Sequence, residues 1–129
     1  MSTKILPDLL YTDDDEWIRV DANEAFIGIT DYAQDSLSDI VYLEFPSVGD
    51  SFEKGETFGV VESVKAAGDL MMPVGGEIIE VNEDLLDTPE AVNEMPYESW
   101  MVKISISNSA ELEALMDAEA YTAYCEERE

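Results

Sequence analysis

The stretch that decides the fold runs from Gly59 to Ile78 and reads GVVESVKAAGDLMMPVGGEI. Two β-prone runs, TFGVVESV and DLMMPV, lie on either side of Lys65. Runs of this kind that are separated by a few small residues are typical of two strands joined by a tight turn. The stretch therefore predicts a β-hairpin with Lys65 at its tip.

Short β-prone segments also occupy much of the remaining chain. They are WIRVDANEAFIGIT (17–30), with a turn near Asp21–Asn23, IVYLEF (40–45), EIIEVN (77–82) and WMVKISI (100–106). In the last of these, Trp100, Val102, Ile104 and Ile106 occupy every second position and are expected on one face. Alternation with a period of two indicates strands with one buried face. The polar segment SVGDSFEKGE (47–56) and the pair Gly75–Gly76 are expected to form a loop and a turn.

Helical signals are few and short. Asp31 and Gln34 form a capping-box pattern, which predicts a short helix over about Tyr32–Leu37. Thr88 is expected to cap one or two helical turns, with Pro89 as the first helical residue. From Ser109 onwards the pattern becomes helical. Leu112, Leu115 and Met116 are expected on one face, which Tyr121, Tyr124 and Cys125 continue or restart.

Many short strands followed by a terminal helix indicate a mostly β protein. The expected fold is a small antiparallel β-sandwich or flattened barrel, because no long helix alternates with the strands as a parallel sheet would require. A chain of 129 residues fits one domain with its own core. We expect a single domain over residues 1–129, with a core at about 11–107 and a C-terminal helical extension at 109–127.

The charge of the chain is strongly negative. It contains 31 Asp and Glu against 6 Lys and Arg, a net charge of −25. Six scattered cations cannot form a basic patch, so nucleic acid and anionic membranes are excluded as expected partners. Two explanations remain for the acidity: adaptation to a high-salt cytoplasm, which we favour, or docking onto basic partners. A halophilic protein is therefore the first expectation.

Several classes of site are excluded by residue content. The chain has no histidine and one cysteine, so it cannot contain a Ser-His-Asp triad, a His-ligated metal site or an internal disulfide. The acidic run TDDDE (12–16) lacks calcium-loop spacing and is interpreted as a solvated loop. No apolar run is long enough to cross a membrane, and the N-terminus lacks the pattern of a secretory signal. We expect a cytoplasmic protein without a metal or catalytic residues.

Lys65 remains as the candidate site. It is either an ordinary exposed turn residue or a lysine that is presented for covalent modification. A hairpin tip suits modification, because the strands hold the base of the side chain while its amine extends into solvent. An exposed lysine amine is protonated at neutral pH and is a poor nucleophile. The functional interpretation is therefore a lysine that receives a cofactor from an enzyme.

The segment VESVKAAGD (61–69) closely resembles the lipoyl-attachment hairpin of glycine cleavage system H proteins. The resemblance continues in the family's order along nearly the whole chain, through DEWIRV (15–20), IGITDYAQDSLSDIVYLEFPSVGD (27–50), GGEIIEVNEDLLDTPEAVNEMPY (75–97) and WMVKI (100–104). It implies a lipoyl-type sandwich (a barrel-sandwich hybrid) of two antiparallel sheets, with the lysine at a hairpin turn and helices at the C-terminus.

The resemblance also implies the function of a non-catalytic carrier. Lipoate on Lys65 would accept the aminomethyl group from glycine decarboxylase, a pyridoxal-phosphate enzyme. It would deliver this group to an aminomethyltransferase that uses tetrahydrofolate, and dihydrolipoyl dehydrogenase would reoxidise it. A lipoate-attaching enzyme is the fourth implied partner.

Residue roles follow from the resemblance position by position. Lys65 is the implied attachment site, and its neighbours Glu62, Ser63, Val64 and Ala66 would present the turn to the attaching enzyme. Glu16 and Asp69 match family positions near the stowed arm, where a carboxylate could bind the aminomethyl cation. Asp15 is a departure, because the family usually has histidine there.

Three alternatives remain open. A biotin carrier has a hairpin lysine but typically reads Met-Lys-Met, whereas Val64 and Ala66 flank Lys65. A lipoyl domain of another multienzyme system usually has Asp before the lysine and belongs to a longer chain. An unlipoylated acidic interaction protein would keep the fold without the cofactor.

Overall fold

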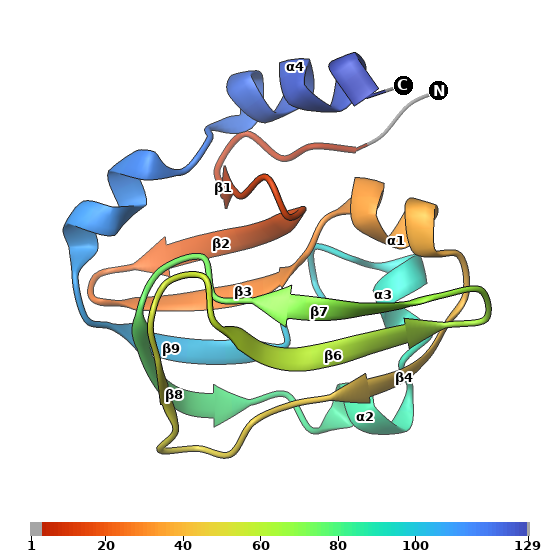
Figure 1. The fold of residues 1–129 in the computed structure, drawn as a ribbon, viewed down its shortest axis with the longest axis horizontal. Coiled ribbons are helices and arrows are strands. Elements are labelled where there is room, and N and C mark those ends of the chain that lie inside the picture. Colours follow the sequence, from red (N-terminus) through yellow and green to blue (C-terminus); the bar gives the residue numbers. More distant parts are fainter. Residues whose placement is uncertain (1–3, 129) are drawn as a thin grey trace.

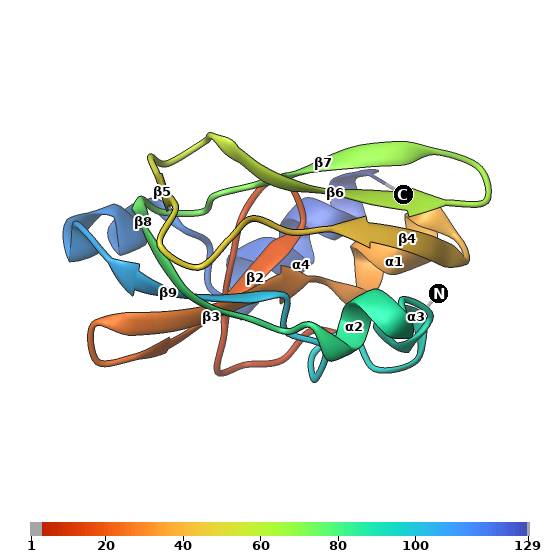
Figure 2. The ribbon, with the colours of Figure 1, turned by 90° about the horizontal axis from the view of Figure 1, so that it is seen from below.

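The computed structural model describes residues 4–128 and contains two antiparallel sheets that pack face to face (Figures 1 and 2). The larger sheet has the strand order β1-β2-β3-β9-β8-β5, and the smaller has the order β4-β6-β7. The strands are β1 Leu10–Tyr11, β2 Glu16–Asp21, β3 Glu24–Ile29, β4 Ile40–Glu44, β5 Ser51–Phe52, β6 Thr57–Ser63, β7 Ala67–Met71, β8 Gly76–Val81 and β9 Val102–Ile106. The helices are α1 Asp31–Leu37, α2 Asp84–Asp87, α3 Ala91–Glu94, a 3₁₀ helix at Ser109–Ala114 and α4 Ala118–Arg128. The expected mostly β sandwich with a C-terminal helix is confirmed.

The main core lies between the two sheets. Leu43, Val61 and Leu70 of the smaller sheet are 3% exposed or less, and Ile27 and Ile104 of the larger sheet are fully buried. Leu43 pairs with Val61 across β4 and β6, so these side chains share one face of the sheet. The opposite face of the small sheet therefore points to solvent.

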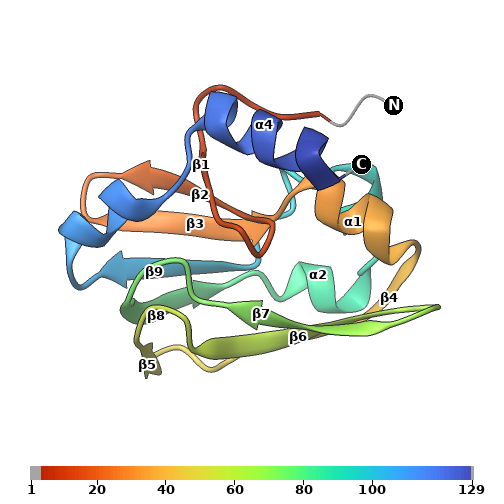
Figure 3. The ribbon, with the colours of Figure 1, turned by 45° about the horizontal axis from the view of Figure 1, so that its top comes forward.

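A second core lies beneath α4, which crosses over β1 and the start of β2 (Figure 3). The Tyr11 and Tyr121 rings stack in parallel at 4.5 Å, and Trp17 and Cys125 are buried beside them. Backbone hydrogen bonds between Tyr11 and Met116 connect β1 to the segment before α4. The C-terminal helix is thus packed onto the end of the sheet that carries the TDDDE loop.

The cap of α1 differs from the prediction by one residue. Thr30 is the N-cap, because its Oγ1 accepts a hydrogen bond from the Ala33 N–H at 3.2 Å. Asp31 is the first helical residue instead, and its carboxylate accepts from the Gln34 side chain at 2.7 Å. Thr30 is fully buried against Tyr121, a long-range contact that the local pattern does not contain.

Two turn predictions are wrong in detail. Gly76 already belongs to β8, and the bend before it lies at Pro73–Val74. Thr88 ends α2 instead of starting a helix, because its hydroxyl donates to the Asp84 carbonyl; α3 begins two residues after Pro89.

The C-terminal segment is two helices instead of one. The 3₁₀ helix ends at Ala114, and Leu115 and Met116 follow it in extended backbone before α4 begins. Leu112 and Leu115 pack against the main core, whereas Met116 packs against the second core. The pattern therefore restarts at α4, where Tyr121 and Cys125 are buried.

Candidate functional site

The tip of the β6–β7 hairpin is a four-residue turn held by the first of its residues, Ser63. The Ser63 N–H donates to the Ala66 carbonyl at 2.7 Å. The Ser63 Oγ accepts from the Lys65 N–H at 3.3 Å and from the Ala66 N–H at 3.0 Å. A short hydroxyl side chain thus satisfies the backbone amides that the tight turn leaves free. The turn is fixed locally, without help from the Lys65 side chain.

The turn presents Lys65 to solvent. Glu62, Lys65 and Ala66 are exposed, and Val64 has 67% of its surface exposed. The Val64 N–H donates to the Asp39 carbonyl at 3.0 Å, which joins the tip to the start of β4. Within residues 4–128, the Lys65 amine forms no ion pair. The hairpin therefore offers a free primary amine on a rigid base.

Asp69 lies on the outer face of the same hairpin. It pairs with Val60 of β6, which pairs in turn with Glu44 of β4. Asp69 and Glu44 are both exposed, while the next residue on β7, Leu70, faces the core. Asp69 is thus a surface carboxylate four residues beyond Lys65.

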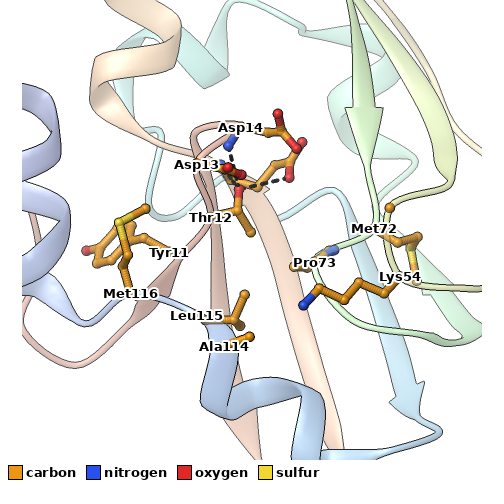
Figure 4. A pocket seen from close by; sticks show the side chains of 12 residues that line it. Tyr11, Thr12, Asp13, Asp14, Lys54, Met72, Pro73, Ala114, Leu115 and Met116 are labelled. Atoms are coloured by element: carbon orange, nitrogen blue, oxygen red, sulfur yellow. Dashed lines mark hydrogen bonds between the residues drawn. The ribbon is translucent and has the colours of Figure 1, made fainter. Parts of the chain in front are cut away.

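A pocket of about 480 Å³ opens at the other end of β7 (Figure 4). One wall contains Lys54, Met72 and Pro73, and the opposite wall contains Leu115 and Met116. The rest of the lining comes from the acidic loop and its surroundings: Tyr11, Thr12, Asp13, Asp14, Glu16, Gly55 and Ala114. The walls are mainly apolar, and the carboxylates come from one loop.

Glu16 is the buried carboxylate of this pocket, with only 2% of its surface exposed. Its Oε1 accepts from the Thr12 hydroxyl at 3.1 Å, and its Oε2 accepts from the Met71 N–H at 2.9 Å. β7 is an edge strand of the small sheet, and Glu16 takes a backbone donor from its free edge. The interpretation of TDDDE as a wholly solvated loop is therefore wrong at its last residue.

Burial raises the pKa of Glu16 to about 8. Desolvation of the carboxylate is the main cause, and repulsion from Asp14 and Asp15 adds to it. The hydrogen bonds from Met71 and Thr12 act in the opposite direction but are weaker. A cation that entered the pocket beside Glu16 would favour the ionised form and would lower this pKa.

The structure brings only some of the candidate residues together. Glu16 bonds to Met71, which lies two residues beyond Asp69 on β7, but Asp69 does not line the pocket. Lys65 is six residues before Met71, and the first two of these belong to the turn, so the tip of the hairpin lies less than about 20 Å along the strand from that end of the pocket. The hairpin tip and the pocket are therefore separate parts of one surface, connected by β7.

Several pocket residues have no signal in the sequence. Thr12, Lys54, Leu115 and Met116 come from three separate segments, and only the packing of these segments places them around one space. Leu115 shows the reason, because an apolar residue after a helical run is normally interpreted as part of the core and not as the wall of a pocket.

An exposed amine at a rigid hairpin tip, on a sandwich of two antiparallel sheets, defines the class of lipoyl-type carrier domains. The family model described as "Glycine cleavage H-protein" matches residues 9–128, and the chain belongs to this family. Glycine cleavage system H proteins from Clostridium botulinum (strain Loch Maree / Type A3) and Halothermothrix orenii are 56% and 53% identical to it, covering 96% and 94% of this chain and 95% of each relative. A mitochondrial H protein of Arabidopsis thaliana is 49% identical, covering 99% of this chain and 83% of its own.

A solved structure supports the same assignment. The crystal structure of a glycine cleavage system H protein from Mycobacterium marinum matches with a TM-score of 0.86 and 34% identity, covering 93% of this chain and 98% of that one. The chain is thus a lipoyl carrier of the glycine cleavage system, a family whose members carry covalently attached lipoate. None of the helices within the described residues is both long and apolar enough to cross a bilayer.

Proposed function

We propose that lipoate is attached to Lys65 through an amide bond between the lipoyl carboxyl group and the lysine amine. The observation that carries this proposal is the exposed Lys65 amine at the apex of a turn that Ser63 holds in place. The neighbouring Glu62, Ser63, Val64 and Ala66 form the surface that the attaching enzyme would contact. The three other described lysines differ in setting: Lys4 is exposed but lies in the N-terminal segment outside any strand, Lys54 lines the pocket, and Lys103 is paired with Glu24.

The residues present fit the lipoyl group. The exposed tip leaves room for a long side chain, and the apolar pocket walls suit a saturated chain that ends in sulfur atoms. When bound, lipoate supplies a disulfide that accepts the aminomethyl group and is restored by oxidation after the group has been delivered.

The chain itself is proposed to catalyse no bond change. Its proposed partners are glycine decarboxylase, a tetrahydrofolate-dependent aminomethyltransferase, dihydrolipoyl dehydrogenase and the lipoate-attaching enzyme. Membership of the glycine cleavage family supports the first three, and the presented lysine supports the fourth.

Glu16 is proposed to hold the aminomethyl ammonium group inside the pocket. Each carboxylate oxygen already accepts one hydrogen bond, and each retains further acceptor capacity for a cation. The buried position excludes water from this contact, which slows hydrolytic loss of the cargo. Asp69 is proposed to attract the same cation from the outer face of β7.

The attachment site is tested by lipoylation in vitro followed by peptide mapping. We expect all of the lipoate on Lys65 and none on the Lys65→Arg variant, which should fold normally because an exposed turn residue contributes little to stability. Lys54→Arg is the matched control and should be modified as well as the wild type. Lipoate on the Lys65→Arg variant would refute the assignment.

The role of Glu16 is tested by loading lipoylated protein with the aminomethyl group and following the release of formaldehyde and ammonia. Glu16→Gln should release the group about tenfold faster, since a charge-assisted hydrogen bond contributes roughly 1.5–3 kcal/mol. Its lipoylation rate should stay close to that of the wild type, because Glu16 lies far from the hairpin tip. Equal release from the variant and the wild type would exclude this role.

A further inference from the structure

One end of α4 is fastened to the acidic loop before β2. The Arg128 guanidinium donates to both carboxylate oxygens of Asp15, at 2.6 and 3.1 Å. Tyr121, which lies two helical turns earlier on the same face of α4, donates its hydroxyl to the same carboxylate at 2.8 Å. The Tyr124 hydroxyl donates to the Asp13 carbonyl at 2.9 Å. Three residues of α4 thus bind two residues of the loop.

Arg128 is itself held on both sides by aromatic rings. Its guanidinium carbon lies 4.1 Å from the centroid of Tyr124 of α4 and 4.1 Å from that of Tyr32 of α1. The side chain of Arg128 is 27% exposed and that of Asp15 is 18% exposed, so the pair is shielded from much of the solvent. A bidentate, partly buried pair of this geometry is stronger than an ordinary surface ion pair. Arg128 therefore joins α1, α4 and the loop at one point.

The loop that Arg128 holds determines where Glu16 lies. Asp15 has a left-handed backbone (φ 68°), and its N–H donates to the Thr12 carbonyl at 3.2 Å. Thr12 accepts the Glu16 N–H at its hydroxyl oxygen and donates that hydroxyl to the Glu16 carboxylate. A change in the position of Asp15 would therefore move both the backbone of Glu16 and the donor of its side chain.

Charge repulsion would open this loop if nothing opposed it. Three consecutive aspartates, Asp13 to Asp15, directly precede Glu16. Within the described part of the chain, Arg128 is the one cation in an ion pair with any of them. Loss of its charge would leave neighbouring carboxylates to repel one another and to move toward solvent.

We propose that Arg128 is a positioning residue, whose ion pair with Asp15 keeps the acidic loop closed and so keeps the Glu16 carboxylate in the pocket beside β7. The consequence for the aminomethyl cargo rests on the proposed function of Glu16, but the positioning itself does not. Arg128 touches neither the hairpin tip nor the pocket, and it acts through Asp15 and the loop.

The Met71 amide reports on this positioning without lipoate or cargo. It points out of the free edge of β7 to Glu16, whereas the next amide, Met72, bonds to the Glu56 carbonyl. Its protection from hydrogen exchange therefore depends on Glu16 being in place. The test measures exchange of backbone amides by NMR in the unlipoylated full chain.

We expect Met71 exchange to become about fivefold faster in Arg128→Gln, which corresponds to ~1 kcal/mol in the local opening equilibrium. Exchange at core strands such as β3 should not change, which separates local repositioning from loss of global stability. Arg128→Lys keeps the charge without the bidentate fork and should give an intermediate rate. Lys103→Gln breaks the Lys103–Glu24 pair at the far end of β3 and β9 and is the matched control, with no change expected at Met71.

Unchanged Met71 exchange in Arg128→Gln, or an equal increase in Lys103→Gln, would overturn the positioning role.

The cargo is tested separately in lipoylated, loaded protein. If Glu16 holds the cargo, Arg128→Gln should also release it faster, and Arg128→Gln combined with Glu16→Gln should release it no faster than Glu16→Gln alone. If Met71 exchange is faster in Arg128→Gln but Glu16→Gln releases the cargo at the wild-type rate, the positioning of Glu16 is supported. Only the proposed function of Glu16 is then refuted.

Discussion

The raised pKa of Glu16 predicts a specific dependence of stability on pH, which Glu16→Gln should remove. The folded protein holds the Glu16 proton up to about pH 8, whereas the ordinary value of the group is 4.5. Between these two values the folded state binds more protons at this site than the unfolded state, so the free energy of unfolding falls as pH rises. The stabilisation that the buried Glu16 carboxyl contributes is complete below pH 4.5 and is lost as pH rises through about 8.

The size of the effect follows from the interval between the two values. At about 1.4 kcal/mol for each pH unit, the interval corresponds to up to ~5 kcal/mol of stability lost by the wild type. Local opening of the acidic loop would let Glu16 regain water at a smaller cost, so the measured change is bounded above by this figure. Even half of it would be a large fraction of a typical domain stability of roughly 5–15 kcal/mol.

Glutamine is a suitable replacement because it mimics the protonated acid. Its carbonyl oxygen can accept from the Met71 N–H, whereas its amide faces the Thr12 hydroxyl, whose oxygen already accepts from the Asp14 and Glu16 N–H groups. The variant therefore keeps the shape and the Met71 contact, gives up the Thr12 contact at every pH, and cannot ionise. Its stability relative to the wild type should rise steadily from about pH 5 to 8 and level off above that.

The assay is urea unfolding at several pH values, followed by the fluorescence of the fully buried Trp17. Potassium chloride at 1 M limits interference from the other acids, because the screening length is then ~3 Å. Asp69→Asn removes an exposed carboxylate and is the control; the difference between its free energy of unfolding and that of the wild type should not change with pH. If the difference for Glu16→Gln also does not change with pH, the reasoning that burial keeps this carboxyl protonated is refuted.

Two further predictions concern the acidic surface and the packing of the hairpin. The chain has a net charge of −25, so its melting temperature should rise steeply between low and molar potassium chloride, because screening weakens repulsion between carboxylates. A melting temperature that stays constant from 0.05 to 2 M salt would instead indicate that the acids serve to dock partners. Gly59→Ala should destabilise the protein by roughly 1–3 kcal/mol, because the added Cβ would lie 2.3 Å from the Glu44 carbonyl oxygen, a backbone atom. Gly68→Ala is the control on the adjacent strand, where the nearest atom is 3.8 Å away, and equal melting of the two variants would contradict this argument.

The hairpin was predictable because its determinants are local. The strands on either side of Lys65 follow from β-prone residues, and the turn between them spans only the four positions from Ser63 to Ala66. The β2–β3 hairpin was predictable for the same reason, and its register runs without interruption from Glu16 opposite Ile29 to Asp21 opposite Glu24. The cap of α1 was misassigned because the true cap, Thr30, is distinguished from Asp31 by its burial against a helix 91 residues away.

The sequence by itself determined the class of the fold, the presented lysine and the resemblance that leads to a lipoyl carrier, since each depends on neighbours along the chain. Only the tertiary structure decided that Glu16, among the acids at positions 4–128, is buried. In the sequence, Glu16 cannot be distinguished from the three acidic residues before it. In the fold, Met71 of β7, 55 residues away, donates its amide to Glu16, and the packed segments exclude water from it. The same is true of Arg128, which meets Asp15 across 113 residues. A carboxylate's environment depends on which distant segments pack around it, and no local pattern of charges encodes that packing.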